Sequence, residues 1–285
     1  MDVHTGEILA LANRPTYDLE HVTSSNVENR TNRVISFVYE PGSVFKIVPA
    51  SAALEEGVFQ ETDKIFCENG KYKIANHILH DHKPHGTLTF QEVFELSSNI
   101  GVAKISQKLG PSVLYKYGTL FRFGKKTGID LKGEVAGVFK HPSQWSKTSI
   151  GAIPMGHEVT TTPLQLVCAT AAIANQGVYM KPFIVKAIKD SDNEIIQSFD
   201  PHMVDRVISP ETAKRLTAIL VGVIEKGTAT RAKIDGVPVA GKTGTAQVAK
   251  NSKGYTNEGE VNYKASFVGY FPADNPKYSC IVVVN

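Results

Sequence analysis

Apolar residues recur at helical spacing in five stretches of the chain, separated by polar or glycine-rich segments. This pattern predicts helices over residues 43–56, 90–96, 100–109, 162–175 and 209–226. Gly57 ends the first of these helices, and Pro49 inside it predicts a kink. Thr162-Pro163 opens the fourth and Gln176-Gly177 ends it, while Ser209 is the predicted N-cap of the fifth.

Shorter apolar runs near both chain ends predict strands. They cover residues 7–11, 237–240, 266–271 and 278–285, and the last is typical of a buried strand. Two further runs, at 184–189 and 194–199, flank Asp190 to Asn193 and predict a hairpin. The remaining stretches, at 12–42, 60–89 and 118–160, are expected to be irregular.

Strands at both ends with helices between them predict an α+β fold. We expect the sheet to be built from residues 1–49 plus 236–285, interrupted by a helical and loop insertion over approximately 50–235. Both ends favour a domain cut from a longer protein, and two edge strands at true chain ends are the alternative. The Thr5-Gly6 turn follows a strand of only three residues, and the strand at 278–285 has no helix after it.

Composition excludes several classes of protein. The chain has 285 residues, 42% hydrophobic and 21% charged, which rules out a wholly disordered, collagen-like or fibrous protein. A net charge of +3 with scattered basic residues does not favour nucleic acid as a partner. Cys67, Cys168 and Cys280 form neither a disulfide framework nor a recognisable metal cluster. The longest apolar stretch, 164–174, is too short to span a bilayer.

The first candidate site is Ser43, followed three residues later by Lys46 on the same predicted helix. A serine that opens a helix points its hydroxyl at the positive end of the helix dipole. Lys46 can accept the serine proton only when it is neutral, which burial or a second nearby cation would favour. An N-cap serine followed by a surface lysine is the structural alternative.

The second candidate lies at 240–246, where a predicted strand continues into Gly241-Lys242-Thr243-Gly244-Thr245. The glycines let a ligand lie close to the backbone, and one cation with two hydroxyls suits a carboxylate. The alternative is a strand that simply ends in a glycine turn. Lys126-Thr127-Gly128 repeats the tripeptide within a loop, so the tripeptide alone is a weak signal.

The third candidate is Ser97-Ser98-Asn99, which lies between two predicted helices. Its hydroxyl and amide groups could relay a proton and bind a substrate amide. Ser24-Ser25-Asn26 repeats this tripeptide in a predicted loop. Ser191-Asp192-Asn193 fits the turn of the predicted hairpin and is assigned no catalysis.

Four histidines lie within residues 60–89, at His77, His80, His82 and His85. Their spacing invites a metal interpretation, but only Asp81 and Cys67 accompany them as further ligands. A solvated loop is the simpler interpretation, and no metal is predicted.

Taken together, the three candidates have the order and setting used by penicillin-binding proteins and class A β-lactamases. Flanking phrases match along nearly the whole chain: Thr5 to Ala10, Tyr39 to Ser43, Ser97 to Gly101, Thr127 to Ile129, Thr161 to Gln165, Gly227 to Ala229, Gly241 to Ala246 and Phe267 to Tyr270. The chain therefore resembles the transpeptidase domain of class B penicillin-binding proteins. Tyr39-Glu40-Pro41-Gly42 and Ser97-Ser98-Asn99 are more like the cell-division branch than the elongation branch.

The resemblance implies a fold, and it implies that segments of the family's domain and of the parent protein lie outside this chain. The fold would be β-lactamase/transpeptidase-like, with an antiparallel sheet flanked by helices and a mostly helical insertion. Against the family pattern, the domain at 1–285 lacks most of its first strand and the helix that follows the last strand. The parent protein would sit on the extracytoplasmic face of the cytoplasmic membrane, anchored by an N-terminal segment absent from this chain.

The implied activity is that of a peptidoglycan D,D-transpeptidase that uses no cofactor. Ser43 would attack the penultimate D-Ala carbonyl of a stem peptide, and Lys46 would accept the serine proton. Ser97 would relay a proton toward the leaving amine, and Asn99 would hold the substrate amide and help position Lys46. An acceptor amine would then release the acyl group from Ser43, and β-lactams would trap that serine.

The resemblance also implies a subsite for the terminal carboxylate. Lys242, Thr243 and Thr245 would bind the carboxylate around Gly244, with Lys242 also close to the relay. The oxyanion would lie on the backbone N–H groups of Ser43 and Thr245. Two cations near one serine repel each other, which favours a neutral lysine at neutral pH.

Other functions remain compatible with the same residues. A D-Ala-D-Ala carboxypeptidase differs only in using water as acceptor, and a serine β-lactamase would need a way to activate water. A penicillin sensor without catalysis is the non-enzymatic alternative. Stem peptides and β-lactams are the implied ligands, and a membrane glycosyltransferase and the division machinery are the implied protein partners.

Overall fold

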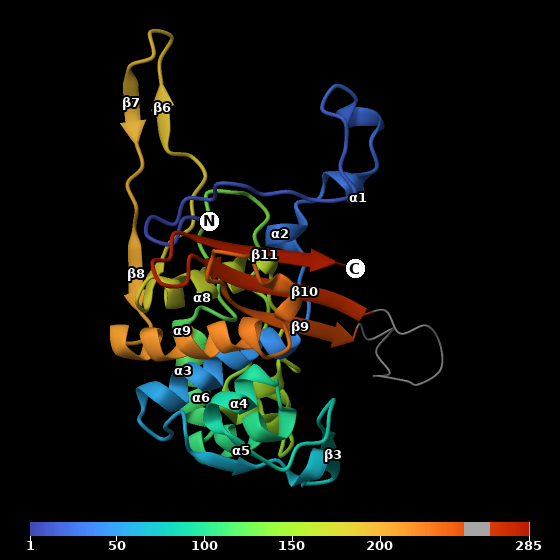
Figure 1. The fold of residues 1–285 in the computed structure, drawn as a ribbon. Coiled ribbons are helices and arrows are strands. Elements are labelled where there is room, and N and C mark those ends of the chain that lie inside the picture. Colours follow the sequence, from blue (N-terminus) through green and yellow to red (C-terminus); the bar gives the residue numbers. More distant parts are fainter. Residues whose placement is uncertain (248–262, 285) are drawn as a thin grey trace.

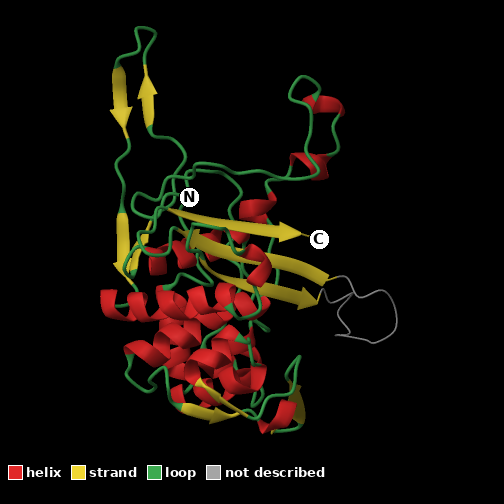
Figure 2. Cartoon of the chain, in the orientation of Figure 1, coloured by secondary structure: helices red, strands yellow, loops and turns green. Residues whose placement is uncertain are grey.

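The computed structural model describes residues 1–247 and 263–284. Its main sheet has the strand order β11-β10-β9, and both pairs are antiparallel. The bounds are Ala240–Gln247 for β9, Tyr263–Phe271 for β10 and Tyr278–Val284 for β11. Figure 2 shows most of the helical structure gathered on one side of this sheet, so the described chain is α+β, as predicted.

Within residues 1–247 and 263–284, six helices of six or more residues build the helical part. They are α3 (Ile47–Glu55), α4 (Phe90–Glu95), α5 (Asn99–Leu109), α6 (Pro111–Leu120), α8 (Pro163–Ala174) and α9 (Pro210–Glu225). α8 packs on β10 and β11, and every one of its residues is buried. α9 packs along β9 and contacts α3 and α4 on its other side, so it lies between the sheet and those helices (Figure 1).

The remaining elements are short. The short α-helices are α1 (Val27–Arg30), α2 (Arg33–Ser36) and α7 (Ser149–Ala152). Turns of 3-10 helix occur at Val22–Ser24, Gly42–Lys46, Glu68–Gly70, Pro142–Gln144, Ile153–Met155 and Thr230–Ala232. Antiparallel strand pairs are β1 (Lys64–Phe66) with β4 (Thr87–Thr89), β2 (Lys71–Ile74) with β3 (His77–His80), β5 (Val178–Met180) with β8 (Met203–Arg206), and β6 (Ala187–Lys189) with β7 (Ile195–Ser198).

Local capping explains why several helices were predicted well. Thr162 and Gln165 form a capping box at the start of α8, in which each side chain binds the other residue's backbone N–H. Ser209 caps α9 by accepting a hydrogen bond from the Thr212 N–H. The predicted hairpin is also confirmed: β6 and β7 project from the body of the molecule (Figure 1).

The predicted helix at 43–56 is wrong in its first turn. Residues Gly42–Lys46 form a 3-10 helix that continues directly into α3. Pro49 therefore lies in the first turn of α3, where a missing N–H is tolerated, and not in the middle of a long helix.

The stretch at 60–89 was predicted to be irregular but contains β1, β2, β3 and β4, so two of the histidines, His77 and His80, lie on a strand. The interpretation of 7–11 as a strand is also wrong. Glu7 makes only an isolated bridge to Phe183, while Asp2 bridges to Tyr278 at the edge of the main sheet.

β11 is not the buried strand that its apolar sequence predicted. As the outer strand it buries Ser279 against α8 and exposes alternate side chains, including Val282 and Val284. The predicted strand at 237–240 is displaced, because β9 begins at Ala240. No helix among the described residues is both long and apolar enough to cross a membrane.

Candidate active site

Ser43 lies in a backbone segment that is tightly enclosed by its neighbours. Gly42 has φ 55°, and a Cβ there would lie 2.7 Å from the Thr245 carbonyl oxygen. On another side, a Cβ on Gly156, which has φ 83°, would lie 2.2 Å from the Gly42 carbonyl oxygen. Only glycine fits both positions, so β9 and the loop at Gly156 approach the Ser43 helix very closely.

The Lys46 side chain is fully buried, and oxygen atoms surround its amine. Its Nζ lies 2.7 Å from the Ser97 carbonyl oxygen, 2.8 Å from Asn99 Oδ1 and 3.0 Å from Ser97 Oγ. A neutral amine has two N–H groups and one lone pair. As an ammonium, Lys46 donates to all three oxygen atoms. When it loses a proton, the Ser97 carbonyl and Asn99 Oδ1 keep the two remaining N–H groups, and the lone pair accepts from the Ser97 hydroxyl, which reverses the direction of that hydrogen bond.

The Ser97 hydroxyl connects the other reactive groups. It donates a hydrogen bond to Ser43 Oγ at 3.1 Å and accepts hydrogen bonds from Lys46 and from Lys242 Nζ, the latter at 3.1 Å. Ser97 has φ 60°, a left-handed conformation that is costly for a residue with a side chain. This conformation turns both its carbonyl and its hydroxyl toward Lys46.

Asn99 is the first residue of α5, and both ends of its amide are bound. Oδ1 accepts from Lys46, and Nδ2 donates to the His80 carbonyl oxygen at 3.0 Å. Ser98 is the N-cap, because its hydroxyl accepts from the Gly101 N–H at 2.9 Å. The loop before α5 therefore holds two of the predicted residues in fixed orientations.

Burial shifts the pKa values of both lysines downward. For Lys46, desolvation holds the pKa well below its ordinary value and the charge of Lys242 lowers it further, whereas Asp81 opposes the shift. For Lys242, desolvation lowers the pKa to about 7. A lysine with a strongly lowered pKa is available as a proton acceptor near neutral pH.

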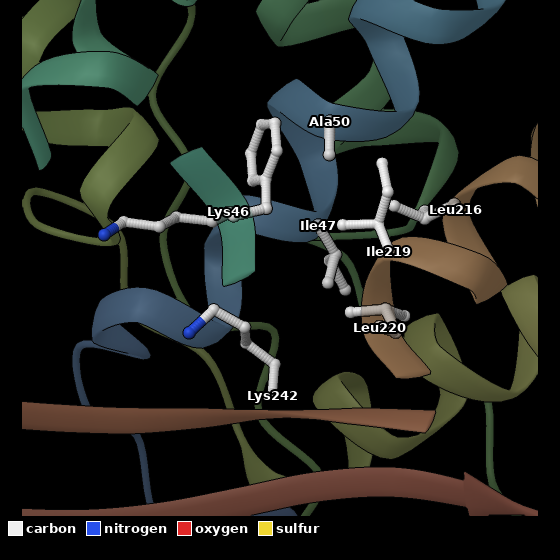
Figure 3. Close-up of a pocket in the computed structure, with 8 residues that line it drawn as sticks. Lys46, Ile47, Ala50, Leu216, Ile219, Leu220 and Lys242 are labelled. Atoms are coloured by element: carbon white, nitrogen blue, oxygen red, sulfur yellow. The ribbon is translucent and has the colours of Figure 1, made fainter. Parts of the chain in front are cut away.

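A small apolar pocket explains this desolvation. It is lined by the stems of Lys46 and Lys242 and by Ile47, Ala50, Phe94, Leu216, Ile219 and Leu220. In Figure 3 both lysine nitrogens point to the same side, away from the aliphatic side chains of α9. The two amines therefore lie within hydrogen-bond distance of the Ser97 hydroxyl, while their aliphatic stems pack against apolar side chains.

The residues predicted to bind a carboxylate lie together on β9. The Thr243 hydroxyl is 3.1 Å from the Thr228 hydroxyl, and the Thr245 side chain is exposed. A Cβ on Gly244 would lie 2.6 Å from Ser266 Oγ and 2.8 Å from the Pro41 carbonyl oxygen. Gly244 thus lets β9 pack closely against the segment that leads to Ser43.

The structure brings all five predicted catalytic residues into one connected group: Ser43, Lys46, Ser97, Asn99 and Lys242. Their individual roles stay predictions. The repeated tripeptides have other surroundings: Thr127 and Gly128 bind the buried Glu134 carboxylate, and Asn26 caps α1. Within residues 1–247 and 263–284, no group of three or more His, Cys, Asp or Glu side chains could hold a metal ion.

Sequence reasoning missed three contacts at the site. The Asp81 carboxylate accepts a hydrogen bond from Ser98 at the start of α5. The Thr228 and Thr243 hydroxyls are hydrogen-bonded to each other. The Glu40 carboxylate pairs with His157 Nδ1 at 2.8 Å. The phrases around Glu40 and Thr228 were already part of the matching sequence, which was a usable signal. Asp81 had none, because it lies 17 residues before the serine that it binds.

Comparisons with known proteins agree along the whole chain. The sequence profile of the penicillin-binding protein transpeptidase domain matches residues 1–285. Stage V sporulation protein D of Bacillus subtilis is 36% identical over 290 residues, covering 100% of this chain and 44% of that protein. Peptidoglycan D,D-transpeptidase FtsI of Escherichia coli is 31% identical, covering 100% of this chain and 46% of that protein.

A solved structure supports the same assignment. The crystal structure of penicillin-binding protein 3 from Mycobacterium tuberculosis, complexed with aztreonam, superposes with a TM-score of 0.86 at 33% identity. The match covers 99% of this chain and 64% of that chain. The chain thus spans about half the length of the curated relatives that it matches.

Proposed function

Because this chain belongs to the transpeptidase domain family of the class B penicillin-binding proteins, we propose that it is a serine-type peptidoglycan D,D-transpeptidase and a target of β-lactams. One observation carries the proposal: the Ser97 hydroxyl lies within 3.1 Å of Ser43 Oγ, Lys46 Nζ and Lys242 Nζ. A nucleophile, a low-pKa amine and a relay between them are the groups that acyl transfer needs.

In the proposed acylation step, Ser43 Oγ attacks the carbonyl carbon of the penultimate D-Ala. The Ser43 proton passes to Ser97 Oγ while the Ser97 proton passes to the lone pair of Lys46. Hydroxyl hydrogens rotate freely enough for the Ser43–Ser97 hydrogen bond to reverse its direction before transfer. This path fits the geometry, since Ser97 lies between Ser43 and Lys46.

The tetrahedral intermediate then collapses. The bond between the penultimate carbonyl carbon and the terminal D-Ala nitrogen breaks, and the relay returns a proton to the leaving amine. An acceptor amine from a second stem peptide attacks the carbonyl carbon of the ester and forms the new amide. The bond from that carbon to Ser43 Oγ breaks, and the relay carries one proton from the amine to Ser43 Oγ. Two backbone N–H groups, of Ser43 and Thr245, are proposed to bind the oxyanion, since β9 lies directly against the Ser43 segment.

The proposal of a carboxylate subsite rests on the positions of one lysine and two threonine hydroxyls on β9. Lys242, Thr243 and Thr245 are proposed to bind the terminal carboxylate of the donor stem, and Gly244 permits the close approach of β9. Each of the three lies on one strand beside Ser43, and the Thr228 hydroxyl orients that of Thr243.

We further propose the cell-division branch, from the Ser97-Ser98-Asn99 sequence, and action on the extracytoplasmic face of the cytoplasmic membrane. A membrane glycosyltransferase and the division machinery are the proposed partners. These proposals rest on resemblance to the family and concern the whole protein. The curated relatives are about twice as long as this chain.

Intact-mass measurement after exposure to penicillin tests the acyl-enzyme. We expect one penicillin adduct on the wild-type chain and none on Ser43→Ala. Lys46→Arg should also lose acylation, because arginine keeps its proton. An adduct on Ser43→Ala, or full labelling of Lys46→Arg, would contradict the proposed roles.

Product analysis separates the alternatives. With a D-Ala-D-Ala donor peptide and an amine acceptor, a transpeptidase forms the cross-linked amide, whereas a carboxypeptidase releases D-Ala with water as the only acceptor. Steady turnover of a chromogenic cephalosporin would indicate a β-lactamase. A folded full-length protein that never acylates Ser43 would indicate a penicillin sensor.

A further inference from the structure

Asp81 directly follows β3 and extends its carboxylate to the start of α5. Its Oδ2 accepts a hydrogen bond from the Ser98 hydroxyl at 2.7 Å. Its Oδ1 accepts from the Asn99 N–H at 2.5 Å and from the Ile100 N–H at 3.0 Å. A carboxylate at the N-terminus of an 11-residue helix is favoured by the helix dipole, and these charge-assisted bonds are stronger than neutral ones.

These bonds fix the residues that surround Lys46. Ser97 and Asn99 supply the three oxygen atoms within hydrogen-bond distance of Lys46 Nζ. The neighbouring His80 carbonyl accepts from Asn99 Nδ2, which turns Asn99 Oδ1 toward the lysine. One segment, His80-Asp81, therefore holds the backbone and the side chain of Asn99 and the hydroxyl of Ser98.

On the acyl-transfer function proposed above, we propose that Asp81 is a positioning residue for that reaction. Its carboxylate holds the loop of Ser97, Ser98 and Asn99 so that the oxygen atoms of Ser97 and Asn99 enclose the Lys46 amine, and it supplies a negative charge that acts on Lys46. Asp81 touches neither the nucleophile nor the proton path in this role, so it acts through the loop and through its charge.

The charged groups around Lys46 give this role a measurable signature. Among the described residues, Lys242 on β9 and Asp81 after β3 are the charged groups that act on the amine, while α4 and α9 present apolar side chains to its stem. Asp81 raises the pKa of Lys46, and Lys242 lowers it. Removing the Asp81 charge should therefore lower the pKa of Lys46 further.

The test is the acylation rate of the whole chain by a fluorescent penicillin across the pH range. Acylation needs neutral Lys46, so its rate rises as pH rises through the pKa of Lys46 and then reaches a plateau. Asp81→Asn keeps the size of the side chain and removes its charge. We expect the acid limb to move to lower pH and the plateau rate to fall by roughly tenfold or more.

Two further variants separate charge from geometry. Ser98→Ala removes one hydrogen bond to Asp81 but leaves its charge, so its plateau should fall while the acid limb stays in place. Asp63→Asn is the matched control, since the Asp63 carboxylate also binds a backbone N–H, that of Gln60 at 2.8 Å, outside the site. It should leave both the plateau and the limb unchanged.

Each result decides the proposal. The proposal is overturned if Asp81→Asn has the same plateau rate and the same acid limb as the wild type. It is also overturned if the plateau rate falls by no more than the unfolded fraction of the variant, measured by circular dichroism. If Asp81→Asn does not fold, an unchanged plateau in folded Ser98→Ala would overturn it instead. A wild-type chain that never labels at Ser43 overturns the proposed function as well, whereas labelled wild type with unaffected Asp81→Asn overturns the role of Asp81 alone.

Discussion

A lysine serves as a base only when it is neutral, and at Lys46 the surroundings supply that condition. Its stem lies against an apolar pocket, and a second amine stands nearby on β9. Both effects disfavour the charged form, and they act on a side chain that is fully buried. The same burial has a cost, because the fold must hold two amines away from water.

Lys242→Met should therefore stabilise the fold while it disrupts the proposed carboxylate subsite. Burial lowers the pKa of Lys242 from its ordinary 10.5 to about 7, so below pH 7 the folded chain must hold a proton that burial disfavours. The cost is fully present below about pH 7 and disappears as pH rises through the unfolded value. We expect a gain of up to about 5 kcal/mol at low pH.

Thermal melting of wild type and Lys242→Met at several pH values measures this difference. The gain in Tm should shrink as pH rises and vanish at alkaline pH. A gain that is constant with pH would show that methionine packing, and not the removal of a buried charge, is responsible.

Most residues of the candidate site could be predicted from the sequence, but Asp81 could not. Ser43 and Lys46 lie one helical turn apart, so their spacing carries information about their proximity. Ser97, Asn99 and Lys242 were found because their short motifs matched a known set in order. Asp81 reaches the same site from a separate strand pair, and no local pattern relates it to α5.

At the scale of elements, the site depends on β9 and the Ser43 helix lying unusually close. Gly42, Gly156 and Gly244 all stand where a Cβ would meet backbone atoms of another segment. These contacts set how far Ser43 lies from the strand that is proposed to hold the carboxylate and the oxyanion.

Gly156→Ala should slow acylation strongly. The effect should be larger than the strain of a positive φ at residue 156 would cause by itself. The new Cβ would lie 2.2 Å from the Gly42 carbonyl oxygen and would displace the residue next to Ser43. A shift of that kind typically costs about 100-fold in rate. Acylation kinetics with a fluorescent penicillin measure it.

Gly133→Ala is the matched control. Gly133 also has a positive φ, of 88°, but a Cβ there meets no atom within 4 Å. Both variants therefore carry the backbone strain of about 1 kcal/mol, and only Gly156→Ala carries the clash. Equal acylation rates in the two variants would refute the importance of this close approach.

Each of the elements that sequence analysis missed or misjudged has its own physical reason. The helix predicted at 100–109 is followed by Gly110-Pro111, which is typical of a helix end, but proline is also favoured at the first position of a helix, and α6 begins at Pro111. β1, β2, β3 and β4 have three or four residues each, too few to show a period. β11 was mistaken for a buried strand because an apolar run does not reveal that it lies at an edge.

At the scale of the whole molecule, a compact body carries the site and a hairpin projects from it (Figure 1). All residues of β7 are exposed, whereas Lys46 and Lys242 lie in the core between β9, α3 and α9. The base of the hairpin is closed by a hydrogen bond from the Phe199 N–H to the Lys186 carbonyl oxygen at 2.9 Å.

Replacement of residues 187–198 by Asn-Gly should therefore leave the chemistry intact. Asn-Gly favours the tight turn that joins two antiparallel strands, and the closing hydrogen bond is already present. We expect an acylation rate constant within about twofold of wild type, since surface changes away from the core have small effects. A loss of more than tenfold, with Tm unchanged, would show that the hairpin contributes to the site.

The hydroxyl of Ser97 joins partners that lie 54 and 145 residues away along the chain, at Ser43 and Lys242. Such long-range contacts form late, after the sheet and the helices have come together. Neither a folding intermediate nor an unfolded molecule would hold the three groups in reach of one another. On the proposed function, a covalent penicillin label would count only native molecules, and the labelled fraction of a preparation would measure directly how much of it has folded.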